Sequence, residues 1–159
     1  MISGTEKIPN VDLNLEDYTM LYRLVENNKK PIIKVVATSK EHGDVPTFNT
    51  IGMIKGVEKP DEYVMLSAHF DSWDGGQGTT DNGTGSIVML EAMRILKKLY
   101  PNPKRTIMVG HWGSEEQGLN GSRAFVEDYP QIVDNIQALF NQDNGTGRVV
   151  DLSGSGFLH

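Results

Sequence analysis

The chain has 159 residues, of which 38% are hydrophobic and 23% are charged, and its net charge is −6. This composition predicts one soluble globular domain, and the acidic balance argues against a nucleic-acid or anionic-membrane partner. No apolar run approaches the roughly 20 residues that a membrane-spanning helix needs. The chain has no cysteine, so disulfides and thiolate chemistry are excluded, and any zinc would be bound by histidines and carboxylates.

The first third of the chain predicts one helix followed by two strands. Apolar residues recur at helical spacing over 12–28, which indicates an amphipathic helix. Residues 32–39 are rich in β-branched side chains and predict a strand, and 49–55 predict a second one. A turn over 40–47, which contains glycine and proline, joins the two strands.

The rest of the chain alternates between hydrophobic strands and amphipathic helices. We expect a buried strand at 63–70, a glycine-rich loop at 74–85, a helix at 86–100, a strand at 106–112, a short helix at 122–129 and a strand at 136–141. This alternation predicts an α/β sheet that is covered by helices on both faces.

Polar residues gather where three of the predicted strands end. His69 and Asp71 close one strand, Glu115 and Glu116 follow another, and Asp143 follows a third. Open α/β sheets bind ligands just outside the carboxyl ends of their strands. The pattern therefore predicts that a histidine and several acids meet at one edge of the sheet.

Each motif taken alone has a structural alternative. His69 and Asp71 lie on one face of a strand, so Asp71 can accept the far ring N–H of His69 and fix its metal-binding tautomer. The alternative is a histidine that simply caps a strand. Asp81 begins an Asp-Asn-Gly sequence, which is typical of a turn. The functional alternative is a carboxylate that bridges two zinc ions.

The remaining acids are equally open when they are considered singly. Glu115 and Glu116 form either a solvated pair or a zinc ligand beside a general base. Asp143 is either a turn residue or a ligand. The combination of one histidine with carboxylates from separate strand ends favours a hydrolytic zinc pair.

The residues from 64 to 122, together with 141–143, closely resemble the co-catalytic zinc exopeptidases related to leucine aminopeptidase, glutamate carboxypeptidase and carboxypeptidase Q. The similar segments are His69-Phe-Asp-Ser-Trp73, Thr80-Asp-Asn-Gly-Thr-Gly85, Trp112-Gly-Ser-Glu-Glu-Gln-Gly-Leu-Asn-Gly-Ser122 and Asn141-Gln-Asp143. The resemblance implies a three-layer α/β/α sandwich with a mixed, mostly parallel sheet. We expect 1–159 to be a single, partial catalytic domain, in which 1–59 includes the segment that would join an absent protease-associated domain.

The resemblance also assigns a role to each candidate residue. By position, His69 and Asp143 would bind one zinc ion, Glu116 would bind a second, and Asp81 would bridge the two. Glu115 would be the general base and Asp71 the partner of His69. The family also implies a cis peptide bond between Asp81 and Asn82. The Asn-x-Thr sequences at Asn82 and Asn144 lie beside proposed ligands, so we interpret them as accidental rather than glycosylated.

The chain departs from the family at its end. The family implies a further histidine for the second zinc ion, well downstream of Asp143, and further strands that would complete the C-terminal side of the sheet. His159 follows Asp143 too closely for that role, and we interpret His42 and His111 as structural. We therefore expect a C-terminally truncated chain with little or no activity of its own.

These inferences predict a zinc-dependent exopeptidase, with aminopeptidase action favoured, that acts on peptides or dipeptides through a water deprotonated by Glu115. Two alternatives stay open: a non-catalytic metal-binding or folding module of such an enzyme, and a glutaminyl cyclase-type acyl-transfer enzyme. We expect an exported parent protein, periplasmic or secreted, although the N-terminus lacks the apolar core of a signal peptide. An unfinished sheet edge would favour a homo-oligomer.

Overall fold

The computed structural model describes residues 11–36, 38, 40 and 42–155. The chain forms two compact units, Met1–Gly43 and Asp44–His159, and each is described by itself below. The prediction of a single domain is not tested by this division and stays a prediction. No helix that the structure describes is long and apolar enough to cross a membrane.

The first unit contains the predicted N-terminal helix, α1, which spans Leu15–Glu26. It begins where Asn14 caps it, because the Asn14 side chain accepts a hydrogen bond of 2.9 Å from the backbone N–H of Asp17. The helix is confirmed, with ends two to three residues inside the predicted range. None of its residues is buried, so α1 does not contribute to a packed core within the described part of this unit.

The predicted strand at 32–39 is wrong for the residues that the structure describes there. Residues 32–36 and 38 are irregular, while 37 and 39 lie outside the described residues. Ile32 is 96% exposed and Val36 is 82% exposed. β-Branched composition favours extended backbone, but a strand forms only when a neighbour takes up its hydrogen bonds. The described residues of this unit include no such neighbour.

The second unit is built on a four-stranded sheet. The strands are β1 (Thr50–Ile54), β2 (Lys59–His69), β3 (Arg105–Trp112) and β4 (Ile136–Asn141). Their order is β1-β3-β2-β4, with β1 antiparallel to β3 and the other neighbours parallel. The predicted strands of this unit and the mixed, mostly parallel sheet are thus confirmed. Since β2, β3 and β4 run in the same direction, their carboxyl ends share one edge.

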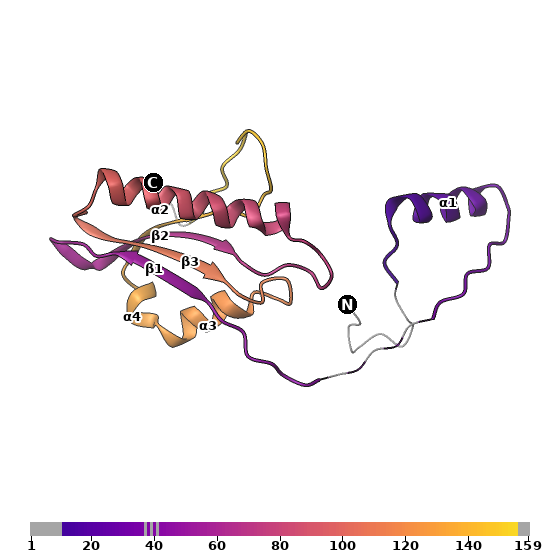
Figure 1. The fold of residues 1–159 in the computed structure, drawn as a ribbon, viewed down its shortest axis with the longest axis horizontal. Helices are drawn as coiled ribbons and strands as arrows, with labels where there is room; N and C mark the ends of the chain where they lie inside the picture. The colour runs from indigo at the N-terminus through magenta and orange to yellow at the C-terminus, as the bar shows by residue number, and fades with distance from the viewer. Residues whose placement is uncertain (1–10, 37, 39, 41, 156–159) are drawn as a thin grey trace. The chain divides into compact units, whose positions relative to one another are not determined.

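Helices cover the two faces of this sheet, as Figure 1 shows. Helix α2 (Gly85–Leu99) packs on one face, and α3 (Asn120–Asp128) and α4 (Pro130–Val133) lie on the other. The alternation of side chains along the strands makes two small cores. The core beneath α2 consists of Leu66, Ala68, Met89 and Val109, and the core beneath α3 consists of Met65, Met108, Trp112 and Phe125. Helix α4 was not predicted, because four residues are too few to show helical periodicity.

Strand β4 forms an edge of the sheet, and its outer side has no strand partner among the described residues. It contains no charged residue and no proline, the usual means of protecting an edge. Leu139 and Phe140 on this strand are 50% and 59% exposed, and Leu139 lines a cavity of about 310 Å³. Self-association through β4 stays a prediction, which sedimentation velocity over a range of protein concentrations would test.

Candidate metal centre

His69, the last residue of β2, lies at the centre of the cluster and is only 3% exposed. Its Nδ1 atom is 3.0 Å from the backbone carbonyl oxygen of Asp71, which can only accept, so Nδ1 carries the hydrogen. Its Nε2 atom lies 2.9 Å from Oδ1 of Asp81 and 3.0 Å from Oδ1 of Asp143. The ring is therefore oriented with Nε2 facing two carboxylates and available as a metal ligand.

Two loops bring these carboxylates to Nε2. Asp81 lies in an irregular helical turn, Thr79–Thr84, that precedes α2, and the expected cis peptide bond between Asp81 and Asn82 is present. Asp143 lies two residues beyond the end of β4, and the N–H of the intervening Gln142 donates a hydrogen bond of 3.0 Å to the carbonyl of Ser67. The glycine-rich loop and the last strand thus meet at the end of β2.

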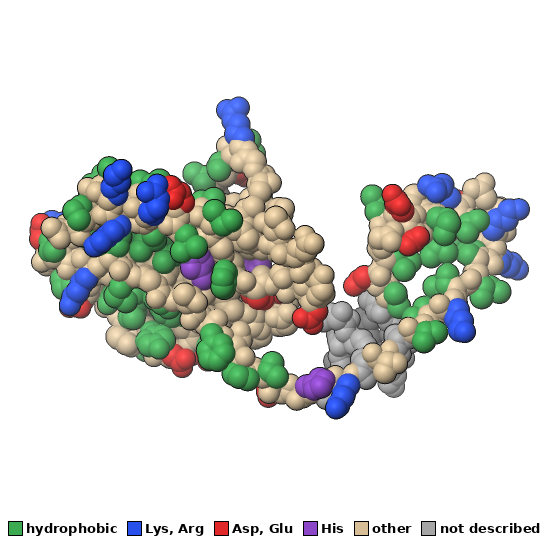
Figure 2. All heavy atoms as spheres, in the orientation of Figure 1, with side chains coloured by type: hydrophobic (Ala, Val, Ile, Leu, Met, Phe, Trp, Pro, Cys, Tyr) green, Lys and Arg blue, Asp and Glu red, His purple; other side chains and the backbone are tan. Residues whose placement is uncertain are grey.

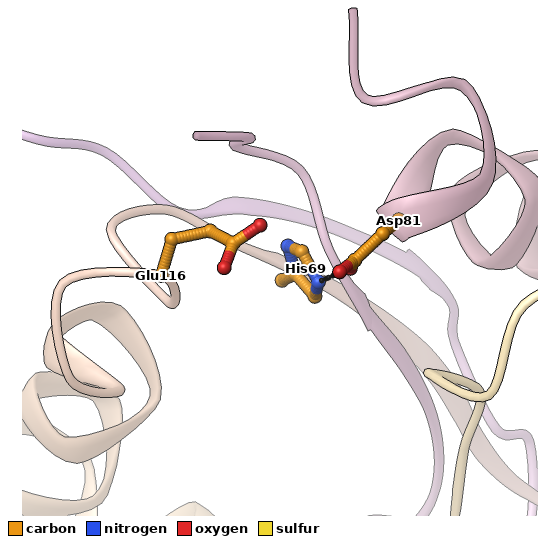
Figure 3. Close-up of side chains that lie close together, drawn as sticks. All are labelled: His69, Asp81 and Glu116. Carbon is orange, nitrogen blue, oxygen red and sulfur yellow. Dashed lines mark hydrogen bonds and ion pairs between the residues drawn. The ribbon is translucent and has the colours of Figure 1, made fainter. Parts of the chain in front are cut away.

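The third loop carries Glu115 and Glu116 from the end of β3. Both carboxylate oxygens of Asp71 accept hydrogen bonds from this loop, 2.9 Å from the N–H of Glu115 and 3.1 Å from that of Glu116. One ligand atom from each of His69, Asp81 and Glu116 lies within 4.8 Å of the other two, and Figure 3 shows His69 between the two acids. Glu115 extends to within 3.9 Å of His69 Nε2. All six predicted site residues therefore lie together.

The role of Asp71 differs in detail from the predicted one. Its backbone carbonyl contacts the His69 ring, whereas its carboxylate is 3.7 Å from Nδ1. The carboxylate is turned away because two backbone N–H groups bind it. Asp71 thus orients the ring of His69 with its backbone carbonyl and fixes the loop of Glu115 and Glu116 with its carboxylate. The contact with the loop was not predicted from the sequence.

The cluster is partly buried and carries an excess of negative charge, because several carboxylates surround one histidine. Burial lowers the pKa of His69, but the hydrogen bond to Asp81 and the charges of Asp143 and Glu115 outweigh it, so that the pKa is raised. Burial raises the pKa of Glu116, and the charge of Asp81 adds to this effect. Lys and Arg side chains of this unit gather mainly at the opposite end of the strands on the face in Figure 2.

These observations fit a bound divalent cation. The Oε1 atom of Glu116 is buried and has no hydrogen-bond partner, which is unusual for a carboxylate oxygen. Asp81 and Asp143 share one imidazole nitrogen, an arrangement that a cation between the three atoms would satisfy. The donor set of imidazole and carboxylates suits zinc.

The other histidines do not supply a further ligand among the described residues. His111 lies on β3 and is paired in register with Ala68, whose side chain packs beneath α2. His42 belongs to the first unit, and His159 lies outside the described residues. A second histidine on the Glu116 side of the cluster, as the family implies, stays a prediction.

His111 provides a test of how much an unpartnered buried imidazole destabilises this fold. It is 5% exposed, neither ring nitrogen has a hydrogen-bond partner, and burial lowers its pKa. We expect His111→Leu to raise the free energy of unfolding by about 1–2 kcal/mol at neutral pH. The gain should grow below about pH 6.5, because the unfolded imidazole takes up a proton that the folded one refuses. Urea denaturation of both proteins at neutral and mildly acidic pH measures this, and a less stable variant would contradict it.

The comparisons with known proteins agree with this site. The sequence profile of Peptidase family M28 matches residues 49–153. The chain is 36% identical over 140 residues to Carboxypeptidase Q of Xenopus laevis, which covers 88% of this chain and 30% of that protein. It is 40% identical over 119 residues to a Probable glutamate carboxypeptidase of Arthroderma benhamiae, covering 72% of this chain and 16% of that protein.

Solved structures show the same relationship. A Peptidase M28 precursor from Shewanella amazonensis matches with a TM-score of 0.73 and 32% identity, over 81% of this chain and 29% of that one. A zinc aminopeptidase from Bacillus subtilis matches with a TM-score of 0.54 and 35% identity, over 60% of this chain and 23% of that one.

Fold and site together define an α/β protein of the metallopeptidase class. The chain belongs to peptidase family M28. It spans about 30% of the length of the carboxypeptidase Q relatives that it matches.

Proposed function

We propose that this chain carries the metal-binding part of a zinc-dependent exopeptidase that removes residues from the amino end of peptides. The observation that supports the proposal most directly is the convergence of Asp81 and Asp143 on Nε2 of His69, with Glu115 also within 4.0 Å of that nitrogen. A structural ion-pair network would pair acids with cations in balance, whereas this cluster sets several carboxylates around one imidazole.

The residues divide into two sets of ligands. His69, Asp81 and Asp143 would hold one zinc ion, and Asp81 and Glu116 would hold a second. The ions, when bound, would polarise the carbonyl of the peptide bond and lower the pKa of water. The buried oxygen of Glu116 would then have the partner that it otherwise lacks.

We assign the proton transfer to Glu115. Its backbone N–H is fixed by Asp71, and its side chain lies beside the cluster with 23% of its surface exposed. Glu115 would take a proton from water as the water oxygen bonds to the carbonyl carbon. It would return that proton to the amine nitrogen when the C–N bond breaks. The same carboxylate thus serves as base and then as acid.

Aminopeptidase and carboxypeptidase action differ in the end of the peptide from which a residue is removed. The names of the relatives include both activities. The test compares a dipeptide amide with an N-acetylated dipeptide, using the full encoded protein with zinc and with a chelator. Zinc-dependent cleavage of the amide alone supports the proposal. Cleavage of the acetylated substrate alone would indicate carboxypeptidase action instead. Cleavage that the chelator does not inhibit would contradict the metal mechanism. For the 159-residue chain itself we expect little or no turnover, because no second histidine approaches Glu116 within its described residues.

A further inference from the structure

One buried amide joins the two loops that carry Asp81 and Asp143. Asn82 is 2% exposed. Its Nδ2 atom donates a hydrogen bond of 2.8 Å to the carbonyl of Gln142, and its Oδ1 atom accepts one of 3.0 Å from the N–H of Gly85. Asn82 directly follows Asp81, and Gln142 directly precedes Asp143. A single side chain therefore spans from one carboxylate loop to the backbone of the other.

The two loops have little freedom to separate or approach at this point. A Cβ atom on Gly85 would lie 2.2 Å from Oδ1 of Asn82 and 2.5 Å from the carbonyl oxygen of Gln142, so the amide, the loop and the start of α2 are in close contact. On its other side, the loop of Asp143 leaves the end of β4, which is attached to β2 because Ser67 donates a hydrogen bond of 2.7 Å to the side chain of Asn141, the last residue of β4. The position of Asp143 relative to Asp81 is thus determined by this amide and by β2.

Asn82 begins an Asn-x-Thr sequence, but its side chain is buried, both of its polar atoms make hydrogen bonds, and it is not accessible for glycosylation. The hydrogen bond that Asn82 Oδ1 accepts from Gly85 joins residues three positions apart, which is also the spacing of a helix-capping bond. The bond that Oδ1 accepts comes from Gly85, the first residue of α2, and so satisfies a backbone N–H at the start of the helix. This role at the helix start does not explain the bond that Nδ2 donates, which leads away from the helix to the loop of Asp143.

We propose that Asn82 is a positioning residue, which sets the separation of Asp81 and Asp143 and so the affinity and geometry of the metal site that they share with His69. The inference rests on the proposed function, since it presumes that this cluster binds a metal. Metal affinity depends strongly on groups that orient the ligands, and loss of such a group typically weakens binding by about 10–100-fold.

The test uses cobalt(II) as the probe, because its visible absorption reports coordination geometry as well as binding. Asn82→Ser keeps a short acceptor near the N–H of Gly85 but cannot reach Gln142, and Asn82→Ala removes both bonds. Thr106→Val is the matched control. Thr106 is 1% exposed, and its hydroxyl likewise donates one bond, to Pro60, and accepts one, from Gly56, at the opposite end of the sheet.

We expect both Asn82 variants to bind cobalt about 10–100-fold more weakly and with an altered absorption spectrum. The Thr106 variant should lose stability but keep the affinity and spectrum of the unaltered chain. Unchanged cobalt affinity in both Asn82 variants overturns the proposal. Loss of cooperative thermal unfolding in both also overturns it, because Asn82 would then determine folding. If the unaltered chain binds no cobalt, the proposed metal site itself is refuted, a result distinct from either of these.

Discussion

Replacing Glu115 by glutamine is expected to lower kcat for peptide hydrolysis by about a thousandfold in the full encoded protein. Glutamine keeps the size of the side chain and the backbone N–H that Asp71 binds, so the loop should stay in place. It removes the carboxylate that would take the proton from water. Because the proposed ligands are His69, Asp81, Asp143 and Glu116, zinc affinity should change by only a few-fold.

The adjacent residue provides the matched control. Glu116→Gln makes the same chemical change one position along the chain, on the side chain whose Oε1 atom is buried without a partner. We expect this variant to lose zinc affinity as well as turnover. Initial-rate assays and competition with a chromogenic chelator measure the two properties separately. Glu115→Gln with full turnover would remove Glu115 from the mechanism, and loss of zinc in both variants would show that Glu115 is a ligand.

The sheet was predictable because each of its strands contains a run rich in hydrophobic residues. Strand β3 is buried over almost its whole length, and β4 begins and ends at the residues predicted from the sequence. The position of the acids could be predicted for the same reason, since they follow strands whose parallel direction sets them at one edge. Hydrophobic pattern and topology together were sufficient to bring His69, Glu115 and Asp143 into one place.

What the sequence could not show depends on contacts between distant segments. Asp71 was expected to bind the His69 ring through its carboxylate, yet that group is bound by two N–H groups 44 and 45 positions away. Asn82 resembled an ordinary turn residue, because its partner Gln142 lies 60 positions further on. The one local signal was the preference of asparagine for the start of helices. This preference accounts for the bond that Asn82 accepts from Gly85, but not for the bond that it donates to Gln142.

The failure at residues 32–36 has a different origin. The pattern of β-branched residues there is as strong as that of 50–54, which does form a strand. The difference is that β1 pairs with β3 over five residues, while the described residues of the first unit offer no strand to pair with. Composition measures a tendency for extended backbone, and pairing decides whether a strand forms.

Zinc is expected to raise the melting temperature of the chain by on the order of 10 °C at about a hundredfold excess over its dissociation constant. A ligand that binds only the folded state adds about 2.7 kcal/mol at that concentration. The folded chain holds several carboxylates around His69, and burial raises the pKa of Glu116, so the metal-free site opposes folding at neutral pH. A divalent cation would replace this repulsion with attraction.

Differential scanning calorimetry with added zinc, and again after an excess of chelator, measures this effect. His69→Ala should abolish the zinc-dependent shift, because the ring contacts both Asp81 and Asp143. His111→Leu should preserve it, because His111 lies on the α2 side of the sheet and forms no ion pair with these carboxylates among the described residues. The two variants each remove one buried histidine, so a difference between them assigns the shift to this site. A melting temperature that neither zinc nor chelator changes would mean that the carboxylates do not form a metal site in this chain.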